Sequence, residues 1–160
     1  MTKTSVTPSV SNPDVAAGVA QFLTPVVIDL TALVVNGKQA HWHVRGANFI
    51  GVHEFLDTLV AHAQEWADMA AERIVALGLP VDARLSTVAA KTTAQDLTAG
   101  FSQSDKTITE IIGQIDAALV SINTAVAELD ELDQTSQDVA IEIARGLDKD
   151  RWFLFAHISE

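Results

Sequence analysis

The sequence predicts an all-α domain built as a bundle of four long helices. A chain of 160 residues is long enough for one domain with a sizeable core. The composition is 48% hydrophobic but only 6% aromatic, and this balance is typical of helical bundles. Apolar residues recur at intervals of three and four along extended segments, and no run of strands is indicated.

The N-terminal region divides into a tail and a long helix. Residues 1–13 are rich in Ser, Thr and Pro and are expected to be a disordered tail, followed by a bundle domain over residues 14–160. The first helical region runs to about Val44. Thr24 and Pro25 have the form of a helix cap followed by a first-turn proline, which predicts a break or kink there.

Gly46 ends the first helical region. The second helix is expected from about Ile50 to Leu77, where Gly78 and Pro80 end it.

The remaining elements follow a long connection over residues 81–100, which contains a short helix near residues 84–89. A third helix is expected over about residues 104–129 and a fourth over about residues 136–158. The apolar positions of the third helix are Ile108, Ile111, Ile112, Ile115, Leu119, Ile122 and Val126. Four long helices with one long connection, between the second and third, indicate a ferritin-like four-helix bundle.

Charge and composition exclude several classes of protein. The net charge of −11 favours solubility and attraction of cations, and it disfavours general affinity for nucleic acid or anionic lipid. The absence of cysteine excludes disulfides and thiolate metal sites. The apolar stretch over residues 19–35 contains Gln21, Pro25 and Asp29, so we interpret it as a buried helix rather than a membrane span. The N-terminus lacks the apolar stretch of a signal peptide, and we expect a cytoplasmic protein.

Histidines and carboxylates form two pairs on the predicted second helix. His53 and Asp57 are four residues apart and share a face, as do Asp68 and Glu72. Asp57 and Asp68 have nearly the same azimuth but are separated by a rise of about 16 Å. Because metal–ligand bonds are only about 2.0–2.6 Å long, one ion cannot contact both pairs on one helix.

A symmetric dimer resolves this separation. The two pairs are placed symmetrically about His62 and Ala63, with Ala61 and Gln64 on the same stripe near that point. An antiparallel second copy would bring each His53 and Asp57 to the partner's Asp68 and Glu72, with His41 on the first helix as a third ligand from the same chain. The hypothesis therefore requires a dimer and gives it two equivalent sites.

Other interpretations remain open at this point. A single histidine is more often a core or surface residue than a ligand, and no role is assigned to His43 or His62. No Glu has a His three residues further on, which disfavours a di-metal centre inside one bundle. Imidazole and carboxylate ligands favour Fe²⁺, Mn²⁺ or Zn²⁺. Open coordination positions would let the ion react with an oxidant or activate water.

Three local sequences, KQAHWHVRGANF, VHEFLD and DMAAERIVALG, resemble the Dps family, the DNA-binding proteins from starved cells, which are miniature ferritins. The resemblance extends over about residues 21–158. It implies a ferroxidase, an enzyme that oxidises Fe²⁺ to Fe³⁺, preferentially with hydrogen peroxide. It also implies a shell of twelve subunits that stores ferric mineral and protects against oxidative damage. The implied iron ligands are His41, His53, Asp57, Asp68 and Glu72.

The same resemblance suggests roles for further residues. Trp42, beside His41, is either an electron source for the site or a core anchor. Trp66 and Trp152 are expected to serve packing. Asp138 and Glu142, four residues apart, either line a pore through which iron enters or are a solvated helix start. The preceding acids Asp130, Glu131 and Asp133 could contribute.

Two other functions compete with iron oxidation. DNA-compacting members commonly carry a lysine-rich tail, whereas this tail has only Lys3, so we expect weak or absent DNA binding. A metal-dependent hydrolase of small amides or esters, as main or second activity, is suggested by the order His53, Glu54 and Asp57. This order is close to the H-E-x-x-H motif, with Glu54 as base. The preferred oxidant and the resting metal occupancy are not specified by the sequence.

Overall fold

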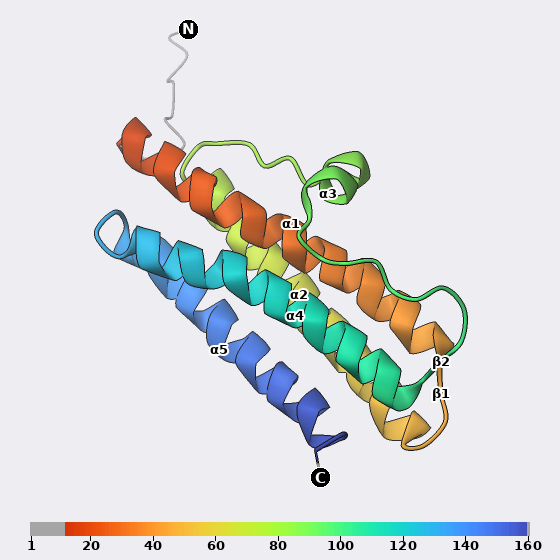
Figure 1. Ribbon diagram of the computed structural model, residues 1–160. Helices are drawn as coiled ribbons and strands as arrows, with labels where there is room; N and C mark the ends of the chain where they lie inside the picture. The colour runs from red at the N-terminus through yellow and green to blue at the C-terminus, as the bar shows by residue number, and fades with distance from the viewer. Residues whose placement is uncertain (1–11, 160) are drawn as a thin grey trace, which may run out of the picture.

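The computed structural model describes residues 12–159 and confirms an all-α ferritin-like architecture. Four long helices form the bundle and a short helix lies in the connection between the second and third of them (Figure 1). The helices are α1 (Pro13–His43), α2 (Phe49–Ala76), α3 (Leu85–Lys91), α4 (Ser104–Leu129) and α5 (Gln134–Ala156). The expected disordered tail over residues 1–13 falls largely outside the described residues, although Pro13 is already helical.

Helix α1 runs without interruption through Pro25, so of the two predicted alternatives, a break or a kink after Thr24, the break is wrong. The Thr24 hydroxyl donates to the Ala20 carbonyl one turn earlier, at 2.6 Å, instead of capping a new helix. Pro25 is exposed, and the three residues after it are buried in the core. Packing of this apolar face outweighs the loss of one backbone hydrogen bond at the proline.

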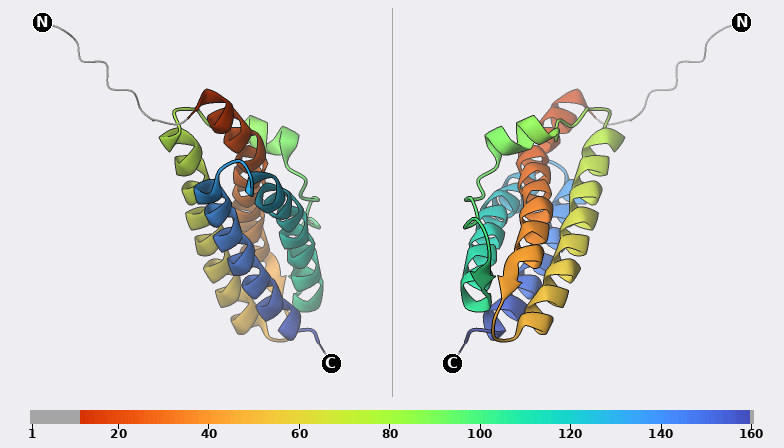
Figure 2. Two further views of the ribbon diagram at one scale, coloured as in Figure 1. Left: turned by 90° about the vertical axis from the view of Figure 1, so that its left-hand side faces the viewer. Right: turned by 90° about the vertical axis from the view of Figure 1, so that its right-hand side faces the viewer.

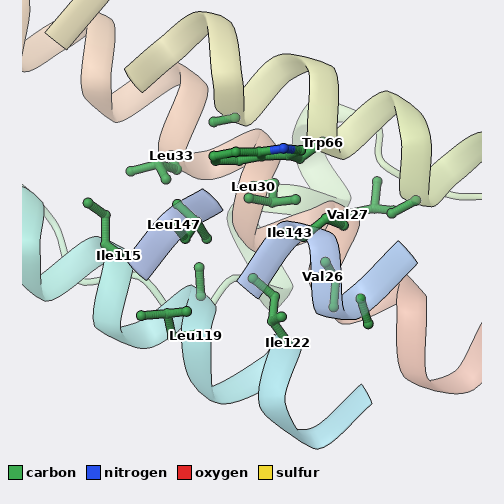
Figure 3. Packing of buried hydrophobic residues seen from close by; sticks show 14 of the residues in the cluster. Val26, Val27, Leu30, Leu33, Trp66, Ile115, Leu119, Ile122, Ile143 and Leu147 are labelled. Carbon is green, nitrogen blue, oxygen red and sulfur yellow. The ribbon is translucent and has the colours of Figure 1, made fainter. Parts of the chain in front are cut away.

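The core occupies the space between the four long helices, and α1 supplies much of it. This helix is long and apolar enough to cross a membrane by composition alone, with a hydropathy of 1.8, but half of its most apolar stretch is buried inside the bundle. Figure 3 shows Val26, Leu30, Trp66, Ile122 and Ile143 in this core. The buried position of α1 supports its interpretation as a core helix.

One close approach in the core requires glycine. A Cβ atom built at Gly146 on α5 would lie 2.1 Å from the Trp66 ring on α2. The absence of a side chain at Gly146 therefore lets the indole fit between the two helices.

The connection between α2 and α4 passes along the outside of α1 (Figure 2). Near its end, two-residue strands pair in parallel: β1 (Val44–Arg45) with β2 (Ser102–Gln103). These strands were not expected from the sequence. The predicted limits of the second, short and third helices agree with the structure to within about two residues. The last helix begins at Gln134 rather than Ser136, because Asp133 accepts from the Ser136 amide at 3.1 Å and caps it.

Candidate metal centre

The ends of α1 and α2 place His41 and His53 face to face. Their ring centroids are 3.7 Å apart and the planes are inclined by 22°. The Nδ1 of His41 donates to the His53 backbone carbonyl at 2.8 Å, and the Nδ1 of His53 donates to the His41 carbonyl at 3.0 Å. A carbonyl oxygen can only accept, so each ring has a hydrogen on Nδ1, and in the neutral form its Nε2 lone pair is left for a metal.

Asp57 lies one turn along α2 from His53, and its Oδ1 is 3.3 Å from the His41 Nδ1. The same oxygen forms an ion pair with Lys38 on α1. The hydrogen bond from Lys38 lowers the pKa of Asp57, with a smaller opposing effect of desolvation and further lowering by the charges of His41 and His53. The carboxylate side chain remains 49% exposed, so an incoming cation can reach it.

Lys38 is a residue of the candidate site that the sequence analysis did not single out. It precedes His41 by three residues on α1 and therefore shares its face. This spacing could have indicated that Lys38 lies near the predicted ligands, although a lysine on a helix is usually exposed to solvent. In the structure its ammonium forms an ion pair with Asp57, one of the predicted ligands.

Asp68 and Glu72 are on the same helix as His53 but are exposed and about four to five turns further along. Among residues 12–159, no group of three His, Cys, Asp or Glu side chains is placed to hold a metal ion. One chain therefore presents two separate partial ligand sets.

A shallow open depression lies between α1 and α2 beside the second ligand pair. Its walls carry mostly small or polar side chains, which would permit a helix to approach closely. The lining residues are Val27, Thr31, Ala61, Gln64, Glu65, Ala67, Asp68 and Ala71. Ala61 and Gln64, which the sequence placed near the proposed two-fold axis, are therefore on this surface.

The other candidate residues lie apart from the histidine pair or point away from the core. Trp42 is 63% exposed, so it is not a core anchor of this chain. Trp66 is buried as expected, whereas Trp152 is 63% exposed and lies edge-on against the Phe153 ring. Asp138 and Glu142 are both exposed on the first half of α5.

One acid of the turn between α4 and α5 is held by hydrogen bonds within the chain. Asp133 accepts from Arg73 at 2.8 Å, as well as from Ser136. Burial raises its pKa, but the hydrogen bonds from Ser136 and Arg73 outweigh burial and leave the pKa of Asp133 below its ordinary value. The remaining acids Asp130 and Glu131 line an open depression at this turn.

Comparison with known proteins identifies the family. The ferritin-like domain model matches residues 23–160. The DNA protection during starvation protein of Agrobacterium fabrum is 36% identical over 135 residues, which are 84% of this chain and 82% of that protein. The chain belongs to the Dps family. Dps proteins oxidise and store iron, protect DNA and form dodecamers.

Solved Dps structures share the fold closely. The structure of Dps from Microbacterium arborescens in the high iron form is 64% identical, has a TM-score of 0.91, and the match covers 94% of this chain and 98% of that one. Dps from Mycobacterium smegmatis in a tetragonal form is 29% identical, with a TM-score of 0.90 and coverage of 98% and 96%. The resemblance noted from three short motifs thus extends to nearly the whole Dps chain.

Proposed function

We propose that this Dps protein is a ferroxidase whose iron sites are each shared by two subunits. The observation that carries the proposal is the division of the ligands. His41, His53 and Asp57 gather at one end of α2, while Asp68 and Glu72 are exposed about 16 Å away. A second α2, packed antiparallel in the depression between α1 and α2, would place the partner's Asp68 and Glu72 beside the histidine pair.

The proposed reaction takes two Fe²⁺ ions as substrate. Two ferrous ions give two electrons to one hydrogen peroxide molecule, and with two protons it becomes two water molecules. Pairing the electrons avoids release of hydroxyl radical, which would explain protection against oxidative damage. The two Nε2 lone pairs and the carboxylates suit Fe²⁺, with Zn²⁺ or Mn²⁺ as substitutes. The high iron form of the Microbacterium arborescens relative supports this choice.

Lys38 gives the proposed site a reversible counter-ion. Its ammonium pairs with the Asp57 carboxylate, so that carboxylate has a cation beside it before iron binds. Binding of Fe²⁺ to the Asp57 carboxylate would displace it, because two cations beside one carboxylate repel each other.

Other parts of the proposal concern transport and assembly. In a cytoplasmic shell of twelve subunits, Asp138 and Glu142 would line a pore that concentrates Fe²⁺ on its way to an interior ferric store. Trp42, exposed beside His41, would supply an electron when only one Fe²⁺ is bound.

Protection of DNA need not involve binding it. A net charge of −11 per chain, multiplied by assembly, repels phosphate, so we propose that protection arises from removal of Fe²⁺ and peroxide. A gel-shift titration at low and moderate salt tests this, and retention of DNA at moderate salt would contradict it.

Subunit complementation tests the shared site directly. One variant, His41→Gln with His53→Gln, loses the first ligand set, and another, Asp68→Asn with Glu72→Gln, loses the second. Each alone should form a shell without peroxide-driven Fe²⁺ oxidation, followed by absorbance. Shells co-assembled from both should recover about a quarter of the wild-type sites, because a mixed dimer has one intact site. No recovery in shells shown to be mixed would exclude sharing.

A further inference from the structure

A second histidine–carboxylate pair links α2 to α5, apart from the proposed iron site. The Nδ1 of His62 lies 2.8 Å from the Asp150 Oδ2. The Asp150 side chain is only 3% exposed, whereas that of His62 is 41% exposed. The imidazole therefore has one edge against a buried carboxylate and another edge open to solvent.

This contact fixes which nitrogen of His62 is available. Imidazole is more basic than a carboxylate, so the shared proton belongs to Nδ1, which donates to Asp150. Within residues 12–159, Nε2 of His62 forms no hydrogen bond. The Trp66 ring, with its centroid 5.3 Å away, limits rotation of the imidazole.

Metal-binding histidines are commonly oriented by a carboxylate that accepts a hydrogen bond from one ring nitrogen while the other ring nitrogen is accessible to the metal. Such a carboxylate selects the tautomer, fixes the ring plane and raises the basicity of the free nitrogen. A purely structural link between α2 and α5 would need only the Nδ1 hydrogen bond and would not require the opposite edge to be exposed.

A carboxylate that could share the ion is one turn away. Glu65 is exposed in the single chain, where it lines the depression that the second α2 is proposed to enter, and it is three residues beyond His62 on α2, so their Cβ atoms are about 5–6 Å apart. We propose that His62, oriented by Asp150, binds one divalent cation of the Fe²⁺ or Zn²⁺ class together with Glu65, in addition to the shared site. Water would complete the coordination, because one chain offers only two ligands here.

The surrounding charges are compatible with a cation at Nε2. Burial raises the pKa of Asp150, and the hydrogen bond and charge of His62 act in the opposite direction. Lys149 is the neighbouring cation, and its ammonium lies over the Phe153 ring, 5.5 Å from the centroid. Only the choice of Fe²⁺ as the natural cation rests on the proposed function, since Zn²⁺ binding by His62 takes no ligand from the partner subunit and involves no oxidation.

Anomalous diffraction from crystals of the assembled protein soaked in Zn²⁺ tests the proposal. We expect a peak about 2.0–2.1 Å from the His62 Nε2. His62→Gln should remove this peak, and His157→Gln, which removes an imidazole elsewhere, should leave it. A wild-type map with zinc at His41 and His53 but none at His62 would overturn the inference and leave the proposed function intact. The reverse pattern would overturn the shared site instead.

Calorimetric titration with Zn²⁺ gives the matching solution measurement. His62→Gln should lose one binding event per chain relative to wild type and to His157→Gln. Asp150→Asn should keep the event but weaken it about 10–100-fold, because the orienting carboxylate is lost. Equal stoichiometry in wild type and His62→Gln would contradict the proposal.

Discussion

Asp29 and Asp57 show how one residue type serves two purposes in neighbouring regions of the bundle. Asp29 on α1 is 3% exposed and accepts four hydrogen bonds from neutral donors at 2.7–3.1 Å. Two of these donors are on Thr93, one is on Thr92 and one is on Ser121. Asp57 is half-exposed and has a flexible lysine as its partner. The first carboxylate is satisfied within the chain, and the second remains available to an external cation.

The difference teaches that the surroundings decide the role of a carboxylate. Asp29 on α1 is hydrogen-bonded to the connection that precedes α4 and to α4 itself. Its buried charge is tolerated because four hydrogen-bond donors point at its two oxygens. The exchangeable partner of Asp57 makes it suitable for binding. The following predictions test this contrast.

The largest effect is expected from Asp29→Ala, which leaves the surrounding donors without an acceptor. We expect a loss of about 3–4 kcal/mol in unfolding free energy. Thermal and urea unfolding at fixed protein concentration measure it, with the exposed Glu128→Gln as control. A loss no greater than that of the control would contradict the role of Asp29.

Asp57→Asn should have the opposite effect, with unchanged stability and slower Fe²⁺ oxidation. Its stability should match that of wild type, because an exposed ion pair contributes little. Peroxide-driven Fe²⁺ oxidation at limiting iron should fall at least about tenfold through loss of a charged ligand. If Asp57→Asn oxidised Fe²⁺ at the wild-type rate but was less stable, Asp57 would have a structural role and not a metal-binding one.

Lys38→Met sharpens the contrast by removing the competing ammonium. Metal affinity at the centre should rise by a factor of about two to five, since Fe²⁺ no longer displaces a cation from Asp57. Lys38→Arg, which keeps the charge, is the control, and Co²⁺ titration followed by absorbance is the measurement. Weaker binding in Lys38→Met would show that Lys38 assists the metal.

The smallest effect concerns the pH dependence of Asp133. Because the folded pKa of Asp133 lies below its unfolded value, its contribution is complete above the ordinary aspartate pKa of about 4 and is lost as pH falls through the folded pKa. The stability difference between wild type and Asp133→Asn should therefore narrow below about pH 4. Melting temperatures from pH 3 to 7 measure it, and a difference that grows on acidification would contradict the assignment.

Local sequence patterns were sufficient to predict the fold class and most helix ends. Gly78 ends α2 with a φ of +92°, a conformation that favours glycine, so its position marked the end reliably. Pro25 misled the prediction because burial of the residues after it, a tertiary effect, keeps α1 continuous. The paired strands of two residues are too short to show a periodicity.

The ligand residues of the proposed site could be named from spacing, but their local contacts could not. Lys38 and Asp57 meet only because α1 and α2 pack side by side. His62 and Asp150 are 88 residues apart in the chain, and no local pattern indicates that they meet. Contacts of this kind depend on the packing of helices, which a single sequence does not display.

The reciprocal bonds of His41 and His53 connect metal occupancy to the mechanics of the α1–α2 hairpin. Each imidazole donates a hydrogen bond to the backbone of the opposite helix, so separating the helices breaks both hydrogen bonds together. A cation coordinated by the two rings therefore opposes opening of the hairpin, by a free energy that grows with the logarithm of its concentration. The melting temperature of this protein should consequently rise with the concentration of free metal.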